Sequence, residues 1–469
     1  MKQGFKNHPY IPNSDPAVEA AMLKELGLHS LEELHAEVPD EIKFKKSMNI
    51  PPAFSSEMEL KKHVGALLRN NANCEDNLNF LGAGCWQHYV PAVCDEINGR
   101  GEFLTAYGGE SYNDFGRFQA LFEYESLVAE LVDMEVVNVP TIDWPQAAAT
   151  ALRMAGRING RKRLLIPAII DPQRRMVIQN YCSPAHQIEA VAYRPVDGLL
   201  DLADLKAKLG PDVAAVYFEN PSYLGFLETQ AEEISALAHA AGAEVVVGVD
   251  PISLGVLAPP VSYGANIVCG DLQPLGIHMN YGGGQAGFIA TMDDPTYVFE
   301  YPSRLFGICP TAVPGEYAFA DVAYDRTSFG ELRHEAKEYV GTQAALWGIT
   351  AGVYLSLMGP TGMREVGETI MQNAHYAAKK LNEIPGVKAN RFGGAFFKEF
   401  VADFNATGKT VAEINAALCE DGIFGGLDLS GLYPELGQCA LYCVTEVHAL
   451  ADLNKLAEAV DRAVSGKGR

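Results

Sequence analysis

The residues best suited to do chemistry lie in the stretch 249–284, "VDPISLGVLAPPVSYGANIVCGDLQPLGIHMNYGGG". Asp250 follows the apolar run "VVVGV", so its carboxylate is expected at the carboxyl end of a buried strand. A carboxylate in that position can pair with the protonated nitrogen of a bound ring. It can equally cap the following turn by accepting backbone N–H groups. Both roles stay open.

The turn 270–280, "GDLQPLGIHMN", is where such a site would gain an amine. Many enzymes that use pyridoxal phosphate (PLP) carry a lysine in the corresponding turn, and that lysine holds the cofactor. Here Gln273 lies 23 residues after Asp250, close to the usual aspartate–lysine separation, but there is no lysine between Lys208 and Lys337. We therefore assign no catalytic residue and predict that the chain alone forms no internal aldimine with PLP, and no borohydride-fixed adduct between Lys208 and Lys337.

Two further features of this turn have alternative interpretations. His278 is a candidate for the same cleft because histidine titrates near neutrality, but a structural hydrogen-bonding role is equally compatible with its place. The run Gly282–Gly284 offers free backbone N–H groups that suit an anion, or close packing against a neighbouring chain. The nine cysteines are scattered, with no Cys-x-x-Cys pair, so reduced thiols rather than a metal site are expected.

The elements that must position these residues follow an alternating pattern. Short apolar runs predict buried strands, and amphipathic segments such as "EEISALAHAAG" lie between several of them. This alternation predicts an α/β fold with a mainly parallel sheet. The strand-like runs are "RKRLLIPAI", "HQIEAVAY", "DVAAVYFE", "AEVVVGVD", "ANIVCGD" and "QAGFIAT".

Changes in the predicted secondary-structure pattern along the chain indicate three domains. Residues 1–75 read as a helical N-terminal arm, which needs another surface because short helices cannot bury a core of their own. Residues 76–365 form the large α/β domain. Residues 366–469 form a small C-terminal α+β domain.

The bulk properties exclude several classes of function. The net charge of −23 argues against binding to nucleic acid or to anionic membranes. No apolar stretch reaches the roughly 18 residues of a transmembrane helix, and the first residues do not resemble a secretory signal. We expect a cytoplasmic protein.

The whole chain resembles subunit 1 of the two-subunit glycine dehydrogenase (decarboxylating), the P-protein of the glycine cleavage system. The resemblance rests on long segments rather than single motifs. They are "YIPNSDPAVEAAMLKELGLHSLEELHAEVPDEIKF", "FLGAGCWQHYVPAVCDEINGRGEFLTAY", "VDPISLGVLAPPVSYGANIVCGD", "VYLSLMGPTGMREV", "GAFFKEFV" and "GIFGGLDLSGLYPELGQCALYCVTEVH".

This resemblance implies a fold-type-I PLP-dependent transferase-like architecture and a lysine-lacking subunit of a heteromeric complex. It implies that the PLP is held by a homologous, lysine-bearing subunit 2. The complex would decarboxylate a small amino acid and transfer an aminomethyl group to a lipoyl-bearing H-protein. Thr105 and Tyr107 are similar to the family's Thr-Ala-Tyr segment and are candidates to reach the partner's cofactor. Asp250, Gln273 and His278 would line this chain's own degenerate cleft.

The sequence departs from the family pattern in loops near the expected cleft. "GGESYNDFGR" follows Thr-Ala-Tyr, and "IDWPQAAAT" and "EAKEYVGTQA" replace two further family segments. Because loops set function on a shared fold, we expect a substrate other than, or in addition to, glycine, such as a substituted small amino acid. Glycine remains the best named substrate. The alternative is a non-catalytic scaffold or regulatory pseudo-enzyme of the same fold.

Overall fold

The protein is described from a computed structural model, which covers residues 10–46, 48–104, 115–322, 326–327, 337–338 and 344–466. The chain separates into two compact units, Met1–Asn71 and Ala72–Arg469. Each unit is described by itself.

The described part of the N-terminal unit consists of short helices, and the side chains of three of these helices are not buried. Its α-helices are α1 (Pro16–Glu25) and α2 (Glu57–Leu68), and its 3₁₀ turns are η1 (Pro12–Ser14) and η2 (Leu31–His35). Asp15 caps α1 by accepting the N–H of Ala17, and Ser56 caps α2 by accepting the N–H of Glu59. No residue of α1, η2 or α2 is buried.

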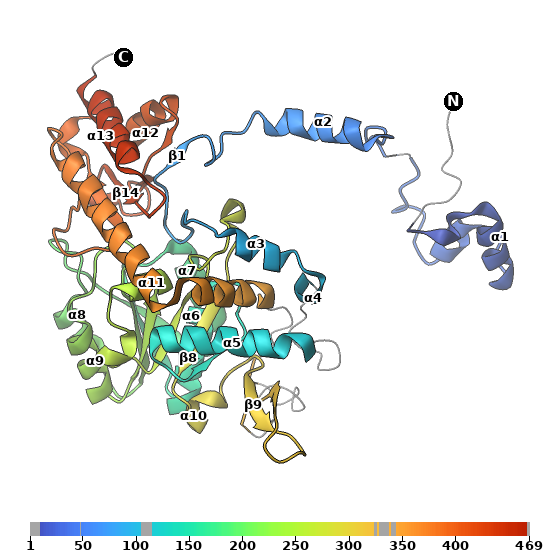
Figure 1. Cartoon of the computed structure of the whole chain (residues 1–469), viewed down its shortest axis with the longest axis horizontal. Helices are drawn as coiled ribbons and strands as arrows, with labels where there is room; N and C mark the ends of the chain where they lie inside the picture. The colour runs from blue at the N-terminus through green and yellow to red at the C-terminus, as the bar shows by residue number, and fades with distance from the viewer. Residues whose placement is uncertain are drawn as a thin grey trace. The chain divides into compact units, whose positions relative to one another are not determined.

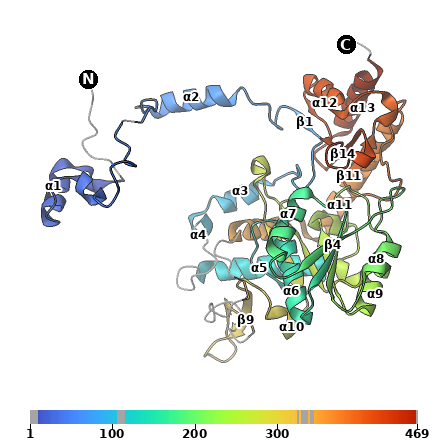
Figure 2. The ribbon, with the colours of Figure 1, turned by 180° about the vertical axis from the view of Figure 1, so that it is seen from behind.

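The second unit centres on a seven-stranded, mainly parallel sheet with the strand order β2-β8-β7-β6-β5-β3-β4 (Figures 1 and 2). Strands β3 to β7 run parallel to one another, whereas β8 is antiparallel to both β7 and β2. The six predicted strands are therefore present. The strands are β2 (Val136–Val137), β3 (Arg163–Pro167), β4 (Gln187–Val191), β5 (Val213–Glu219), β6 (Glu244–Val249), β7 (Ile267–Asp271) and β8 (Gly287–Thr291).

Helices cover both faces of this sheet, so its strands are apolar on both sides. Val245 and Val247 of β6 face a core shared with α5 (Phe115–Val132) and α11 (Ala345–Asn382), whereas Val246 faces α6 and α7. The other helices of this part of the chain are α3 (Ala92–Asn98), α4 (Gly101–Leu104), α6 (Trp144–Asn159), α7 (Pro172–Cys182), α8 (Leu202–Lys208), α9 (Ala231–Ala240) and α10 (Pro295–Val298). A hairpin of β9 (Phe306–Pro310) and β10 (Tyr317–Asp321) and the 3₁₀ turns η3 (Pro251–Gly255), η4 (Pro260–Tyr263) and η5 (Asn280–Gly282) complete it.

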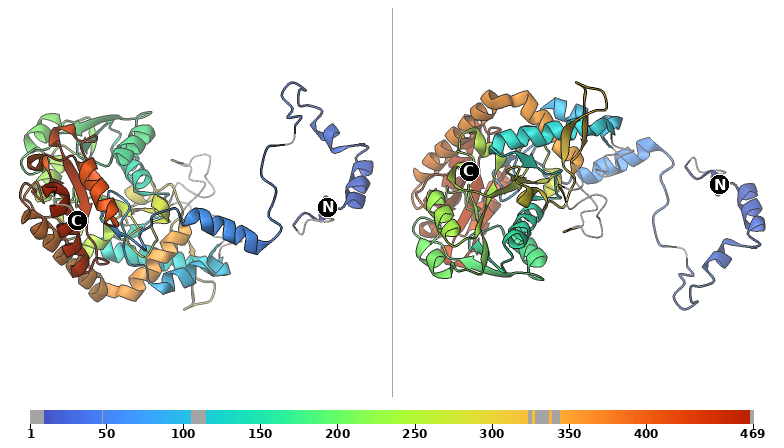
Figure 3. Two further views of the ribbon diagram at one scale, coloured as in Figure 1. Left: turned by 90° about the horizontal axis from the view of Figure 1, so that it is seen from above. Right: turned by 90° about the horizontal axis from the view of Figure 1, so that it is seen from below.

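A smaller C-terminal module lies at one end of the sheet, coloured orange to red in Figure 1, and Figure 3 (left) looks down on it. Its antiparallel sheet has the order β11-β14-β13, and β12 pairs with β1 of the preceding segment. Its elements are β11 (Glu399–Asp403), α12 (Val411–Glu420), β12 (Ile423–Phe424), β13 (Leu427–Asp428), β14 (Cys439–Cys443), α13 (Leu450–Ser465) and the 3₁₀ turns η6 (Asn405–Thr407) and η7 (Pro434–Leu436), with β1 at Leu78–Asn79.

The long helix α11 connects the two parts of this unit. It contains a kink at Gly359, whose φ of 59° and ψ of −177° are not helical, and Pro360 follows. Its first segment packs against α5, and its second segment packs first against the core of the main sheet, through Met363 and Ile370, and from Ala374 onward against α13. The division of the chain at residue 365 stays a prediction. In the described part of the chain, no helix is long and apolar enough to cross a membrane.

Candidate functional site

Three buried carboxylates mark the carboxyl edge of the main sheet. Glu219 ends β5, Asp250 follows β6 and Asp271 ends β7, and each is at most 4 % exposed. Burying a charge without compensation costs several kcal/mol, so each carboxylate must find a partner. The three partners differ in kind, and the differences define the site.

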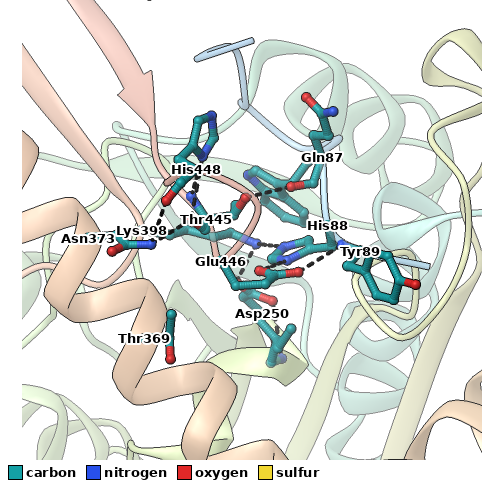
Figure 4. Close-up of polar contacts among 12 residues, drawn as sticks. Gln87, His88, Tyr89, Asp250, Thr369, Asn373, Lys398, Thr445, Glu446 and His448 are labelled. Carbon is teal, nitrogen blue, oxygen red and sulfur yellow. Dashed lines mark hydrogen bonds and ion pairs between the residues drawn. The ribbon is translucent and has the colours of Figure 1, made fainter. Parts of the chain in front are cut away.

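Asp250 is paired with a lysine from the other end of the chain. Its Oδ2 lies 2.7 Å from the Nζ of Lys398, and both side chains are almost fully buried. Its Oδ1 accepts the N–H of Ile252 at 3.2 Å and so caps η3. Figure 4 shows the lysine reaching across from the C-terminal module to the end of β6.

Lys398 makes three favourable contacts in this buried position. Besides Asp250, its Nζ lies 3.1 Å from Nε2 of His88 and 3.6 Å from the centre of the Trp86 ring. A cation over an indole face is stabilised by the negative face of the ring. The ammonium is therefore fully partnered.

His88 continues this contact into a chain of alternating groups. Its Nδ1 lies 2.8 Å from Oε2 of Glu446, whose Oε1 accepts the N–H of Tyr89, also at 2.8 Å. Because an ammonium can only donate, Nε2 of His88 accepts from Lys398 and Nδ1 carries the proton given to Glu446. Burial alone would raise the pKa of Glu446, but the interactions with His88 and with backbone N–H groups outweigh burial and lower that pKa to about 2.

Glu219 is neutralised within the large domain. Its Oε1 accepts from Nη1 of Arg174 at 2.6 Å and from the hydroxyl of Tyr217 at 2.8 Å. The guanidinium of Arg174 also stacks over the ring of Trp144, 3.7 Å from its centre. Trp144 is buried here as packing.

Asp271 is held by backbone donors rather than by a cation. It accepts N–H groups from Trp144, Gln273 and Ala286. Burial nevertheless dominates and raises the pKa of its carboxyl to about 7. A second carboxylate, Asp143, caps the same helix α6 by accepting the N–H of Gln146.

Gln273 occupies the position at which the sequence would have placed an amine. Its amide is saturated by backbone: Oε1 accepts the N–H of Trp86, and Nε2 donates to the carbonyls of Trp86 and Ile277. The side chain is 1 % exposed. It fastens the segment around Trp86 to the turn and points no free group into the cleft.

His278 does not join Asp250. Its Nε2 lies 3.0 Å from Oδ1 of Asp95 in the first turn of α3, and both side chains are more than half exposed. Just beyond it, Asn280 and Tyr281 have positive φ, and the Tyr281 side chain is fully exposed. The structure thus separates His278 from Asp250, whereas His278 and Gln273 both line a neighbouring pocket that also includes His88.

Thr105 and Tyr107 lie outside the described residues, as do Tyr112 and the family-like Thr342. Their proposed roles remain predictions.

The residues at the carboxyl edge do not fit a bound PLP. Asp250 is already neutralised by Lys398, and the N-terminus of α6, a place where anions bind on helices, is capped by Asp143 and Asp271. The cavity between Trp86, Trp144 and Lys398 leaves a volume of about 20 Å³, room for about one water molecule. No described cluster of His, Cys, Asp and Glu could hold a metal ion.

Sequence reasoning missed Lys398 and His88. The search for an amine covered the turn after β7, whereas Lys398 comes from "GAFFKEFV", 148 residues beyond Asp250. The available signal was a lysine inside an apolar strand-like run, since lysine is almost never buried without a partner.

The fold and the position of these carboxylates define the class of the protein: a fold-type-I PLP-dependent transferase-like architecture. A sphingosine-1-phosphate lyase of Burkholderia pseudomallei shares the fold, with a TM-score of 0.65 and 14% identity over 91% of this chain and 94% of that one. A NifS-like protein of Rickettsia africae shares it with a TM-score of 0.60 and 12% identity over 83% and 99%.

More specific similarity comes from the sequence. Residues 8–457 match the family of the glycine cleavage system P-protein. The chain is 38% identical to a probable glycine dehydrogenase (decarboxylating) subunit 1 of Staphylothermus marinus, over 96% of this chain and 97% of that one. It is 39% identical to the same-named protein of Pyrococcus furiosus, over 93% and 95%. A crystal structure of the glycine decarboxylase P-protein in inhibitor-bound form matches with a TM-score of 0.84 and 32% identity over 96% and 98%. The chain belongs to the glycine cleavage system P-protein family.

Proposed function

We propose that this chain is the cofactor-free subunit of a two-subunit complex of the glycine decarboxylase type. One observation carries the proposal: Asp250, the carboxylate that would face a cofactor ring, is neutralised by Lys398, in a chain with no lysine between Lys208 and Lys337. A subunit whose cleft is closed in this way contributes through association rather than through its own reaction centre.

The partner in this proposal is a homologous chain that carries the Schiff-base lysine and holds PLP. Relatives of the present chain are named subunit 1, which supports a division of labour between two chains. PLP supplies an electron sink for decarboxylation of an amino acid. A lipoyl-bearing H-protein then receives the aminomethyl group. Thr105 and Tyr107 are proposed to reach the partner's site, on the strength of the sequence resemblance.

The N-terminal unit supports an obligate association. Apolar side chains such as Ile42 and Phe44 are each 73 % exposed, and no residue of α1, η2 or α2 is buried. Residues 1–71 contain nine Lys or Arg and ten Asp or Glu, so they are nearly neutral in a chain of net charge −23. A surface with exposed apolar side chains and almost no net charge suits a protein partner better than a strongly charged ligand.

The substrate is proposed to be a small amino acid, with glycine or a substituted analogue as the candidates. Divergence in the segments "GGESYNDFGR" and "IDWPQAAAT" favours an analogue. Trp144, in the second segment, is buried against Arg174, so within this chain that segment shapes the closed cavity.

The test is co-expression with the lysine-bearing homologue and a substrate screen that follows exchange of labelled bicarbonate into the carboxyl group. We expect one stable complex and exchange that this chain raises at least about tenfold over the partner alone. Exchange with glycine at full rate and with no analogue would contradict the altered substrate. Equal exchange with and without this chain, by a folded partner, would favour the scaffold alternative.

A further inference from the structure

We propose that Lys398 is a built-in cation that fills the place of a bound organic cation at Asp250 and holds this cavity closed. The inference concerns this chain's own cleft and its test measures no turnover. Its failure would therefore leave the proposed subunit role standing, and the failure of that role would leave the inference intact.

The first argument is the match between Lys398 and its surroundings. Nζ lies 2.7 Å from Oδ2 of Asp250 and 3.1 Å from the acceptor nitrogen of His88, with the Trp86 ring 3.6 Å away. A carboxylate, a neutral acceptor and an aromatic face together form a receptor for a compact organic cation. Lys398 supplies that cation from inside the chain.

The second argument is that the neighbouring charges are already in use. Arg174 is paired with Glu219, and Glu399 accepts the N–H of Ala83 at 2.6 Å. Among the described residues, the ion pair of Asp250 is the one with Lys398. Removing the ammonium would leave a buried carboxylate beside an aromatic wall with no replacement from the protein.

The third argument is the origin of the lysine. Lys398 directly precedes β11 of the C-terminal module, and its carbonyl accepts the N–H of Val444 in the same module. The pair with Asp250 therefore ties this module to the carboxyl edge of the main sheet. The contact between His88 and Glu446 does the same from the segment before α3. The two contacts, Lys398 with Asp250 and Glu446 with His88, join the C-terminal module to the rest of the unit and so close the cavity (Figure 4).

It follows that the chain carries a latent site for a small alkylammonium ion. Lys398→Ala removes three carbons and the nitrogen, and n-propylammonium has the same atoms. We therefore expect n-propylammonium to bind the full-length K398A chain and not the wild type.

The test measures thermal unfolding of the full chain. K398A should melt roughly 3–5 °C below the wild type, because a buried carboxylate loses its partner. At about a hundred times its dissociation constant, n-propylammonium should raise the K398A melting temperature by about 3 °C. Sodium chloride at equal ionic strength and 1-propanol, a neutral molecule of similar size, should not. The matched control is K398A/D250N, in which the receptor charge is absent and no cation-specific rise is expected.

Several results would overturn the proposal. K398A could melt with the wild type, or 1-propanol could stabilise it as well as the ammonium ion does. The same rise in K398A/D250N would also contradict a site built on Asp250.

If K398A does not fold, a second pair of variants tests the proposal. Lys398→Met keeps most of the side-chain volume but removes the charge, and the stability of K398M is compared with that of D250N/K398M. The proposal expects K398M to lose stability and the double variant to recover most of it, since no unpaired charge remains. A stable K398M, or a double variant no better than the single one, would overturn it.

Discussion

The cleft of the second unit and the surface of the N-terminal unit differ in whether their side chains have partners within the chain. In the cleft, the buried carboxylates Glu219, Asp250 and Asp271 all have partners from the same chain. In the N-terminal unit, α1 and α2 bury none of their side chains. The carboxylates at the sheet edge are thus partnered from within the chain, whereas the apolar side chains of the N-terminal unit stay exposed.

This contrast suggests where function resides in a degenerate member of an enzyme family. A site that has lost its reactive amine still contains a buried acidic edge, and that edge must be neutralised or it destabilises the fold. The exposed apolar side chains of the N-terminal unit leave no charge buried, and under the proposed function they form the association surface. Variants in the two regions should therefore separate stability from assembly.

The largest effect is expected from the N-terminal unit. Replacing Ile42 and Phe44 by aspartate should weaken binding to the lysine-bearing subunit by about a thousandfold, since each exposed apolar anchor is expected to contribute about 2 kcal/mol. Titration calorimetry or analytical ultracentrifugation measures this. Glu41→Ala and Lys45→Ala in the same stretch serve as the control and should bind normally. Unchanged binding by the aspartate variant would show that this surface is not the interface.

The next effect tests whether the cleft is closed at Gln273. Gln273→Lys should destabilise the chain by about 3 kcal/mol or more, because the Trp86 N–H loses its acceptor and a buried ammonium gains no carboxylate. Urea unfolding measures the loss, and His278→Lys, in the exposed part of the same turn, should cost little. If Q273K were stable and formed a borohydride-reducible adduct with PLP at residue 273, the cleft would not be closed.

A smaller effect, of at most about 3 kcal/mol, depends on pH. Burial raises the pKa of Glu399 to about 7, so the folded chain keeps a proton between pH 4.5 and 7 that the unfolded chain has released. Its contribution to stability is thus present below pH 4.5 and is lost as the pH rises through 7. Glu399→Gln should flatten part of this decline, while the part due to Asp271 remains.

The control for this pH dependence is Glu446. Its lowered pKa gives a contribution that is present above pH 4.5 and lost as the pH falls toward 2, so Glu446→Gln should leave the slope between pH 5 and 7 unchanged. Melting temperatures of the three proteins across pH 4–8 make the comparison. An unaltered slope in E399Q would mean that Glu399 is ionised throughout this range.

The smallest effect is expected at His278. Because its contact with Asp95 is more than half exposed, His278→Ala should change the free energy of unfolding by less than about 1 kcal/mol. Chemical denaturation measures it, and Asp95→Asn is the reciprocal variant. A loss of several kcal/mol would show that this turn belongs to the closed cleft after all.

The scaffold was predictable from the sequence because it depends on local pattern. Runs such as "DVAAVYFE" and "AEVVVGVD" became β5 and β6, since apolar β-branched runs of this length suit strands buried on both faces. The spacing of Ser56 and Glu59 also predicts a helix start, and Ser56 does cap α2. The same spacing of Ser30 and Glu33 predicts a capping box that does not form: the Ser30 side chain accepts no N–H group, Glu33 accepts the N–H of His29, and the turn is a 3₁₀ helix. Fine geometry at helix ends depends on more than the spacing of two residues.

The site was less predictable because it depends on contacts between distant segments. The sequence identified Asp250 at the end of β6, but its partner Lys398 directly precedes β11 of another module, and no local spacing encodes that register. His278 attracted attention through its residue type and its place in the turn, yet it lies exposed beside Asp95. His88, in the segment before α3 that was noted only for its family resemblance, is the histidine in contact with Lys398.

The kink in α11 depends on the backbone torsions of a single residue. Gly359 adopts φ 59° and ψ −177°, a region open essentially to glycine alone, yet a Cβ added there would meet no atom within 4 Å. There is therefore room for a side chain at this position, and glycine is required by the backbone torsions instead. The backbone of Gly359 thus sets the direction in which α11 continues past the main sheet toward the C-terminal module.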